Sequence, residues 1–475
     1  MKPTRQADLC ILGGGSAGLS VAAGAAQMGA RTVLIEAHRM GGDCLNTGCV
    51  PSKSLLAAAK AAARIRDGQR FGVTSEPPHI DFAAINRHVH GVIAAIAPHD
   101  SVERFTKLGC QVIQAPGRFV DERTVEAGGQ RIQARRFVIA TGGRAAIPPI
   151  PGLDTVPYFT NETLFEITTL PESLVVIGAG PIGCEMALAH RRFGSRVTVL
   201  DQGPLLPKDD PEAADVVRQA LIRDGVTLAE TVTLLRIEKT PQGLAVVLND
   251  GGHEKRIEGS HLLVATGRQP VVEALGLEQA GIRYTPKGIT VDDRLRTSNR
   301  RVFAAGDVIG GPQFTHLAGY HAGIVLRNAL FRLPAKVNLR ALPWVTYTEP
   351  ELAQVGLTET AARAQQGDNL RVLRADFADN DRAIAEGTPS GFVKALVTTR
   401  GEILGCTIVG PQAGELIQAW ALAMSARLKV SALAGMIAPY PTLGEINKRV
   451  AGGFFTPTLF GPRTRALVQF LGWFG

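Results

Sequence analysis

The chain has 475 residues, which is long enough for several domains with large hydrophobic cores. Its six cysteines are too few for a small secreted protein stapled by disulfides, and no apolar run reaches the length of a membrane-spanning helix. The net charge of +8 is scattered and forms no basic block interleaved with aromatic side chains, which disfavours nucleic acid as a partner. We therefore expect a cytoplasmic protein whose positive charge attracts anionic cofactors.

The first predicted element is a dinucleotide-binding unit at residues 7–36. An apolar strand leads into G-x-G-x-x-G, followed by a helical stretch and a second apolar strand that ends at Glu36. Gly13 permits the tight turn, Gly15 lets backbone amides approach a pyrophosphate, and Gly18 lets helix pack on strand. The helix N-terminus would stabilise the anion, and Glu36 would accept hydrogen bonds from a ribose.

A cysteine pair follows directly, in G-G-D-C-L-N-T-G-C-V-P-S-K at residues 41–53. The spacing of Cys44 and Cys49 is unusual for zinc, so we predict no metal site. We expect a helix to begin at or just after Cys49, and both its N-terminus and Lys53 favour a thiolate. The pattern therefore indicates a redox pair. The other cysteines lie in apolar surroundings and are predicted to be structural: Cys10, Cys110, Cys184 and Cys406.

A second copy of the unit occupies residues 173–201. Its fingerprint glycines are Gly178, Gly180 and Gly183, and its second strand ends at Asp201. The first glycine precedes the acid by 23 positions in both copies, and two intact fingerprints are far more specific than one. The alternative is that one copy is only a structural remnant. Both copies later reach the phrase A-T-G, which contains the predicted cofactor contacts Thr141, Gly142 and Gly267.

The two copies and the thiol pair together predict an electron path. Nicotinamide exchanges electrons poorly with sulfur, whereas a flavin exchanges them with both. We therefore expect NAD(P)H, then FAD, then Cys44 and Cys49, with FAD held by the first copy because the cysteines follow it. The carboxylate of Asp201 favours NAD(H), since a 2′-phosphate would face it. NADP(H) is the alternative if one of the nearby arginines reaches the site: Arg191, Arg192 or Arg196.

The chain continues with a predicted strand and turn in V-F-A-A-G-D, which ends at Asp307. From Leu342 onward we predict a third domain, which contains strands such as Phe392–Thr398. In the tail, Pro462 suits the first position of a helix. Four apolar residues then follow helical spacing: Leu467, Phe470, Leu471 and Phe474. With nearby Lys and Arg, this stripe would either lie on an anionic membrane at its inner face or pack on the dimer surface.

The redox box, the two fingerprints and A-A-G-D resemble the pyridine nucleotide-disulfide oxidoreductases, which include dihydrolipoamide dehydrogenase, glutathione reductase and mercuric reductase. The resemblance runs from about Ala7 to Ile446. It implies that Cys44 is the interchange thiol facing substrate and Cys49 the charge-transfer thiol under the flavin. It further implies that Lys53 lies near flavin N5 and pairs with Glu185, and that Asp307 binds the ribityl-phosphate region.

The resemblance also implies the architecture. We predict an α/β fold with two Rossmann-like dinucleotide-binding domains plus a C-terminal α+β dimerisation domain, which completes the partner's active site in a homodimer. The predicted divisions are an FAD-binding domain (1–150, continued at 271–340), an NAD(P)-binding domain (151–270), a dimerisation domain (341–461) and an amphipathic tail (462–475).

One position departs from the disulfide-reducing members. Where they carry His-Pro, followed four residues later by Glu, this chain has Tyr440-Pro441 and Glu445. A phenol with a pKa of about 10 is a poor proton shuttle at neutral pH. Mercuric reductase is similar in having Tyr at this position. It typically ends in a vicinal cysteine pair, however, whereas this chain ends in G-W-F-G. We also expect no metal-binding domain before residue 1.

We therefore predict an FAD-dependent NAD(P)H oxidoreductase of mercuric-reductase-like type, which reduces a small-molecule or metal-ion acceptor through Cys44 and Cys49. The alternatives are a dihydrolipoamide dehydrogenase-type disulfide reductase and a reductase of quinones or other metal ions. A non-enzymatic sensing or assembly protein is disfavoured, because the predicted electron-transfer residues are all present.

Overall fold

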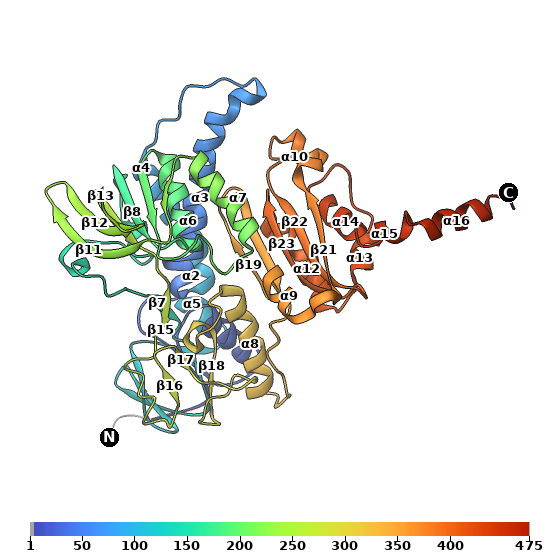
Figure 1. Cartoon of the computed structure of the whole chain (residues 1–475). Helices are drawn as coiled ribbons and strands as arrows, with labels where there is room; N and C mark the ends of the chain where they lie inside the picture. Colours follow the sequence, from blue (N-terminus) through green and yellow to red (C-terminus); the bar gives the residue numbers. More distant parts are fainter. Residues whose placement is uncertain (1–3, 475) are drawn as a thin grey trace. The chain divides into compact units, whose positions relative to one another are not determined.

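A computed structural model describes residues 4–474 and shows a mixed α/β protein (Figure 1). The chain divides into two compact units. Unit 1 runs through Gly178 and adds Ala189–Gln202 and Val232–Val337. Unit 2 comprises Ala179–Leu188, Gly203–Thr231 and the chain from Asn338 onward. The predicted α/β fold class is confirmed, whereas the finer domain boundaries stay a prediction.

The main sheet of unit 1 is built around two long strands, Thr4–Leu12 (β1) and Gln130–Ile139 (β6), which pair in parallel. The sheet order is β3-β2-β1-β6-β5-β4, and β18 pairs in parallel with the end of β6. The other strands of this sheet are Thr32–Glu36 (β2), Cys110–Gln114 (β3), Gly117–Asp121 (β4), Thr124–Ala127 (β5) and Val302–Ala304 (β18). The predicted strand before Asp307 thus joins a sheet that begins about 300 residues earlier, near residue 4.

Helices cover this sheet because its strands are apolar on both faces; the last six residues of β1 are all buried or nearly so. Ser16–Gln27 (α1) packs against Thr315–Ala329 (α8), and a Cβ on Gly24 would lie 2.5 Å from a Leu326 methyl group. The remaining helices of the segment are Gly42–Asn46 (α2), Cys49–Asp67 (α3), Phe82–Ile96 (α4) and Val102–Lys107 (α5).

The second copy forms a smaller parallel sheet, in which β8 lies between β9 and β14. These strands span Ser173–Ile177 (β8), Arg196–Leu200 (β9) and His261–Val264 (β14). An antiparallel sheet of β11, β12 and β13 accompanies it, with bounds Thr233–Thr240, Gly243–Asp250 and His253–Gly259. Two short pairs complete unit 1: Gly143–Ala145 (β7) with Arg268–Pro270 (β15), and Tyr284–Thr285 (β16) with Gly288–Ile289 (β17). The helix Pro181–Phe193 (α6) follows β8.

Unit 2 contains a five-stranded antiparallel sheet of order β19-β20-β23-β22-β21. Its strands are Pro343–Thr346 (β19), Glu351–Gly356 (β20), Leu370–Asp376 (β21), Phe392–Thr398 (β22) and Ile403–Gly410 (β23). All seven residues of β22 are buried, and the predicted strand at these residues is confirmed. The smaller elements are Thr227–Ala229 (β10), Pro211–Arg223 (α7), Glu359–Gln366 (α9), Asp381–Ala385 (α10) and Ala413–Leu416 (α11).

Three helices cover the sheet of unit 2 and supply its core (Figure 1). They span Gln418–Ser425 (α12), Val430–Gly435 (α13) and Glu445–Gly452 (α14). Trp420 is fully buried, and its indole N–H donates to the side chain of Asn447 at 2.9 Å, which satisfies the one polar group of a large apolar side chain.

A buried lysine also belongs to unit 2. Lys394 on β22 is 5% exposed, and its ammonium lies 2.8–3.0 Å from the carboxylates of Asp210, Glu212 and Glu359. These partners hold the pKa of Lys394 above its ordinary value despite burial. The cluster fixes the beginning of α7 against the sheet, which no sequence pattern indicated.

The tail forms Thr456–Leu459 (α15) and Pro462–Leu471 (α16), which extend away from the sheet of unit 2 (Figure 1). Proline at the first position of α16 is confirmed. The helix ends at Leu471, so the predicted helical stripe through Phe474 was one turn too long. Gly472 follows there, and glycine is a poor residue for continuing a helix.

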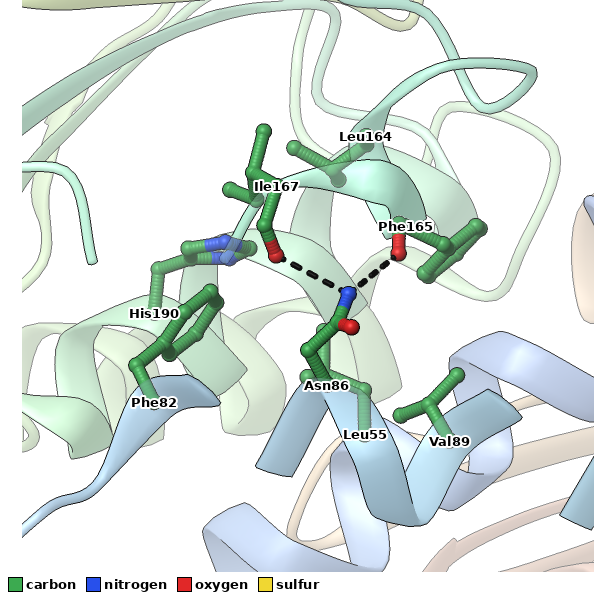
Figure 2. Close-up of a pocket in the computed structure, with 8 residues that line it drawn as sticks. All are labelled: Leu55, Phe82, Asn86, Val89, Leu164, Phe165, Ile167 and His190. Carbon is green, nitrogen blue, oxygen red and sulfur yellow. Dashed lines mark hydrogen bonds between the residues drawn. The ribbon is translucent and has the colours of Figure 1, made fainter. Parts of the chain in front are cut away.

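A small cavity lies in unit 1 among α3, α4 and residues 164–167 (Figure 2). The Asn86 amide donates to the backbone oxygens of Phe165 and Ile167 at 2.9 and 3.0 Å, while Phe82 and Leu55 line the apolar side. Its volume of about 10 Å³ is enough for a single water molecule. The cavity is therefore a packing feature and not a cofactor site.

Candidate active site

The first fingerprint turn requires glycine at two positions. Gly13 has φ +109°, and a Cβ there would lie 2.2 Å from the Ala140 carbonyl oxygen. A Cβ on Gly18 would lie 1.8 Å from the carbonyl oxygen of Gly13. Since real Cβ atoms do not approach oxygen this closely, any larger residue would displace the turn between β1 and α1.

The N-terminus of α1 offers an anion site. Gly15 is its N-cap and has no side chain with which to satisfy the amides of the first turn, so these can donate to a pyrophosphate. Gly42 approaches this turn so closely that a Cβ on it would lie 2.7 Å from the Gly15 Cα. The segment before Cys44 therefore borders the predicted pyrophosphate position.

Glu36 ends β2 beside this turn and is 9% exposed. Its two carboxylate oxygens accept hydrogen bonds from the backbone N–H groups of Gly14, at 2.5 Å, and His38, at 2.7 Å. Each oxygen retains a second lone pair for a ribose hydroxyl. The position agrees with its predicted ribose role, which stays a prediction.

The predicted contacts Thr141, Gly142 and Asp307 lie near the antiparallel pair of β7 and β15. The Thr141 hydroxyl donates to the Val271 carbonyl at 2.8 Å, and Gly142 has φ +71°. A Cβ on the neighbouring Gly143 would lie 3.4 Å from the Asp307 Cβ. Burial raises the pKa of the Asp307 carboxyl, against the opposing effect of a nearby arginine.

That arginine is Arg268, which the sequence analysis missed. Its guanidinium is 13% exposed and lies 2.9 Å from the Asp43 carboxylate and 3.6 Å from that of Asp307, and it donates to the Gly143 carbonyl at 2.9 Å. The A-T-G phrase directly before Arg268 was the available signal. The arginine joins the redox segment to the predicted FAD-binding aspartate within unit 1.

Asp43 is the second missed residue, one position before Cys44. One carboxylate oxygen accepts from the Thr47 hydroxyl at 2.5 Å and from the Asn161 amide at 3.1 Å, while the other faces Arg268. Asn161 is 7% exposed and also donates to the Thr47 carbonyl. These contacts hold the short helix α2, which carries Cys44, from both sides.

Cys44 and Cys49 lie within hydrogen-bonding reach of each other, on α2 and at the first position of α3. The predicted helix start at Cys49 is therefore confirmed. The Cys49 sulfur also contacts the Thr315 hydroxyl at 3.4 Å, at the start of α8. Lys53 lies one turn further along α3, on the same face as Cys49.

These neighbours shift the pKa values of the two thiols in opposite directions. The hydrogen bond from Cys44, with contributions from Thr315 and Lys53, lowers the pKa of Cys49 to about 6, although burial opposes this. The same hydrogen bond and burial raise the pKa of Cys44. These opposite shifts favour the thiolate at Cys49 and the protonated thiol at Cys44. By contrast, the other four cysteines are buried, as predicted.

The second fingerprint repeats the first turn. Gly178 has φ +114°, and a Cβ on it would lie 2.4 Å from the Ala265 carbonyl oxygen. Gly180 and Gly183 accompany the start of α6, and Asp201 directly follows β9. Gly267 has φ +144°, two residues after Ala265. The strand, turn and helix expected for a dinucleotide site are thus present, while the nucleotide contacts stay a prediction.

The remaining predicted residues lie in unit 2. Glu185 is 3% exposed, and its carboxylate accepts from the backbone N–H of Tyr347 at 3.0 Å. Its pairing with Lys53 stays a prediction. Tyr440 is 69% exposed and precedes a cis peptide bond, and Glu445 begins α14.

The Tyr440 hydroxyl donates to the carboxylate of Asp381 at 2.7 Å. This hydrogen bond and the nearby negative charge raise the pKa of Tyr440, with a smaller contribution from Glu445. Asp381 was not predicted, because it precedes Tyr440 by 59 positions.

Two properties of residues 4–474 bear on possible partners. In that range no three His, Cys, Asp or Glu side chains group closely enough to hold a metal ion. Among the same residues, every helix is too short or too polar to cross a bilayer.

Comparison with known protein families decides the assignment. Residues 7–322 match the pyridine nucleotide-disulphide oxidoreductase family, and residues 342–451 match the dimerisation domain of that family. The chain belongs to this family. It is therefore an enzyme, and the dimerisation domain indicates a homodimer.

Relatives of two activities are similar to the chain. A mercuric reductase from Bacillus cereus is 36% identical over 441 residues, which cover 92% of this chain and 70% of that protein. A dihydrolipoyl dehydrogenase from Bacillus subtilis is 33% identical over 448 residues, covering 92% and 96%. The two identities are too close to separate the activities.

Two solved structures are similar to the chain over almost its whole length. The Cu(II) complex of RclA, an HOCl-induced flavoprotein disulfide reductase from Escherichia coli, aligns with a TM-score of 0.84 and 28% identity, covering 94% of this chain and 99% of that one. LpdA from Mycobacterium tuberculosis aligns with a TM-score of 0.86 and 29% identity, with the same coverage.

The family is FAD-dependent and uses NAD(P)H. The residues of unit 1 fit FAD, because the Gly13 turn leaves no room for a Cβ and the amides at Gly15 face the predicted phosphates. Glu36 and Asp307 would hold the ribose and the ribityl-phosphate region. FAD, when bound, would supply two-electron exchange between a nicotinamide and the dithiol.

Proposed function

We propose that the protein is an NADH-dependent, mercuric-reductase-like enzyme that reduces a thiol-binding metal ion at Cys44 and Cys49. For Hg(II), NADH supplies two electrons and the products are NAD⁺, a proton and Hg(0). The mercuric reductases among its relatives and the Cu(II) complex of RclA support a metal-ion acceptor. The single observation that favours a metal ion over a disulfide as the acceptor is the hydrogen bond from Tyr440 to Asp381, which keeps the phenol protonated.

Reduction of a disulfide consumes two protons, because two thiolates must leave as thiols. A group near the interchange thiol must therefore exchange protons at neutral pH. By resemblance, Tyr440 faces the partner subunit's Cys44, where disulfide-reducing members have His. Its bond to Asp381 stabilises the neutral phenol and raises its pKa. A metal ion needs no such proton, so the substitution penalises disulfides selectively.

The chain's own thiols suit a metal-ion acceptor. The lowered pKa of Cys49 favours its thiolate, and the raised pKa of Cys44 favours retention of a proton there. A soft metal ion bound by both sulfurs displaces that proton, since thiolate and not thiol is the ligand. Lys53 and Thr315 stabilise the negative charge at Cys49 before the metal arrives.

The test is an acceptor screen on the purified holoenzyme with NADH and Hg(II), Cu(II), lipoamide, oxidised glutathione or quinones. We expect Hg(II) or Cu(II) to exceed lipoamide in kcat/KM by at least about tenfold. Tyr440→His should raise lipoamide turnover about 100-fold, the lower end of the range of general acid–base catalysis, and leave metal turnover unchanged. Tyr284→His is the control, because Tyr284 also donates to a carboxylate, that of Glu278, and has a raised pKa.

A dihydrolipoyl dehydrogenase is the second candidate. It is favoured by the retained Glu445 at the start of α14 and by the relatives of that activity. Robust lipoamide turnover by the unmodified enzyme, with metal ions inactive, would establish this alternative and overturn the metal proposal. Reduction of quinones alone would overturn both.

The proposed preference for NADH rests on Asp201, which follows β9 where a 2′-hydroxyl is expected. Asp201→Asn removes the charge that repels a 2′-phosphate, so kcat/KM for NADPH should rise about tenfold, corresponding to about 1.4 kcal/mol. Glu258→Gln changes an exposed acid that ion-pairs with Arg256, which is not one of the arginines near the site, and should leave the ratio unchanged. A wild-type kcat/KM that favours NADPH would contradict the preference.

A further inference from the structure

The chain continues past its dimerisation domain as a C-terminal arm, defined here as residues 455–474. The family match ends at residue 451, and the arm contains α15 and α16. In unit 2 it extends away from the five-stranded sheet (Figure 1). Because the arm lies beyond the matched dimerisation domain, that match does not explain its role.

The root of the arm is anchored on unit 2. The Arg371 guanidinium lies 4.4 Å from the centre of the Phe454 ring, and a Cβ on Gly401 would lie 3.5 Å from the same ring. At the start of the arm the Phe455 ring lies 5.1 Å from that of Phe454, and the Thr456 hydroxyl donates to the Gly452 carbonyl at 3.5 Å. Further along, the Thr464 hydroxyl donates to the Thr458 carbonyl at 2.7 Å. The arm is thus held at one end and presented outward.

The arm exposes large apolar side chains along its whole length. Phe460 is 66% exposed, Trp473 84% and Phe474 75%. The Phe470 ring lies 5.2 Å from that of Phe474 and 6.5 Å from that of Trp473, so the aromatic residues gather at the tip. Other exposed members are Leu459, Leu467, Val468 and Leu471. Soluble surfaces rarely leave so continuous an apolar segment uncovered, which indicates an occupant.

The charges of this segment have one sign. Glu445 is the last acidic residue of the chain, and the cations that follow it are Lys448, Arg449, Arg463 and Arg465. On α16 the two arginines occupy the first turn, while the aromatic residues lie at the opposite end. A surface that complements this arm must be anionic and must accept apolar side chains beside the charges.

A bilayer interface with anionic lipids meets both requirements, whereas a second copy of this chain, with net charge +8, offers the less favourable electrostatic match. The ten residues of α16 extend about 15 Å, half of a hydrocarbon core, so the helix would lie in the interface. Tryptophan and phenylalanine favour this boundary.

We propose that the C-terminal arm docks the enzyme peripherally on anionic membranes. The apolar side chains of α16 and the tip enter the headgroup–acyl boundary, while Arg463 and Arg465 contact lipid phosphates. The same arm on both subunits of a dimer doubles the attachment and strengthens it through avidity. This inference is independent of the acceptor proposed above.

Co-sedimentation of the full-length holoenzyme with sucrose-loaded vesicles tests it, comparing phosphatidylglycerol–phosphatidylcholine mixtures with phosphatidylcholine alone. We expect binding to the anionic vesicles only, and weaker binding at high salt. Arg463→Gln with Arg465→Gln should lower the partition coefficient about 25-fold for each arm, because each cation contributes a factor of about five. Phe470→Ser with Phe474→Ser should lower it at least about tenfold.

The matched control is Arg118→Gln with Lys239→Gln, which removes two exposed cations of unit 1 and should leave binding within about twofold of wild type. Light scattering follows the oligomeric state, which every arm variant and a deletion of residues 462–475 should leave dimeric. Equal binding to neutral vesicles, no binding by the intact enzyme, or loss of the dimer on deletion would overturn membrane docking. The last result would instead assign the arm to a second copy of the chain.

Discussion

The two dinucleotide-binding fingerprints use the same backbone and differ in what surrounds it. Gly13 and Gly178 have φ values of +109° and +114°. A Cβ on Gly13 would lie 2.2 Å from the Ala140 carbonyl oxygen, and a Cβ on Gly178 would lie 2.4 Å from that of Ala265. Each of these alanines is the first residue of an A-T-G phrase. Such agreement between separate copies shows that the turn is determined by close backbone approach, for which glycine alone is suited.

The difference lies in the segment inserted after the second strand. In the first copy, Glu36 binds two backbone amides, and the chain then continues into α2 and α3 with the redox thiols. In the second copy, a shorter acid, Asp201, directly follows the corresponding strand and no thiol pair comes after it. One copy has thus been extended into a redox site, whereas the other keeps the plain nucleotide-binding pattern.

The largest expected effects come from breaking the shared turn in each copy. Gly13→Ala should abolish stable flavin binding, measured as flavin absorbance per protein. Gly178→Ala should retain flavin but lower kcat/KM for NADH about 100-fold, corresponding to about 3 kcal/mol of strain and displaced backbone.

Two glycines with similar dihedral angles supply the controls. Gly109 has φ +96° and Gly194 has φ +118°, but a Cβ on either would meet open space. Alanine there tests the positive φ alone and should cost about 1 kcal/mol of unfolding free energy without loss of either cofactor. Equal losses at Gly109 and Gly13 would contradict the assignment of the turn to close backbone approach.

A smaller effect concerns the redox cysteines that follow the first copy. Alkylation of Cys49 in the reduced enzyme should rise with pH around a midpoint near its pKa of about 6, since only the thiolate reacts. In the holoenzyme, Cys49→Ser should lose the long-wavelength charge-transfer absorbance, while Cys44→Ser should show it without reductant. Absence of the band from Cys44→Ser at every pH would reverse the two assigned roles.

Removing one donor to the Cys49 thiolate refines this test. Thr315→Val deletes the hydroxyl 3.4 Å from the sulfur and should move the alkylation midpoint upward by about one pH unit, because the thiolate loses a stabilising hydrogen bond. Thr155→Val removes a hydroxyl that bonds only within its own turn, to the Gly152 carbonyl, and should leave the midpoint unchanged.

The smallest effect concerns the acid of the first copy. In Glu36→Gln one of the two backbone donors, at Gly14 or His38, would face an amide N–H₂ in place of an acceptor. We expect a loss of about 1–2 kcal/mol in unfolding free energy, measured by urea denaturation. Glu76→Gln, at an exposed loop position, should fall within about 0.5 kcal/mol of wild type. An unchanged stability for Glu36→Gln would contradict the structural role of its carboxylate.

The sequence by itself determined the elements whose cause is local. The turns at Gly13 and Gly178, the helix that begins at Cys49 and the proline at the start of α16 were all predicted, because a dihedral angle or a helix terminus depends on adjacent residues. The buried cysteines followed equally from their apolar neighbours.

Only the tertiary structure decided which distant side chains contact the redox segment and Tyr440. Thr315 contacts Cys49 across 266 positions of sequence, and Arg268 reaches Asp43 from the other copy of the dinucleotide unit. Asp381, which determines the state of Tyr440, is likewise 59 positions away. Polar partners of this kind follow no periodicity, because hydrogen bonds and ion pairs depend on where folding brings the atoms and not on their spacing in the chain.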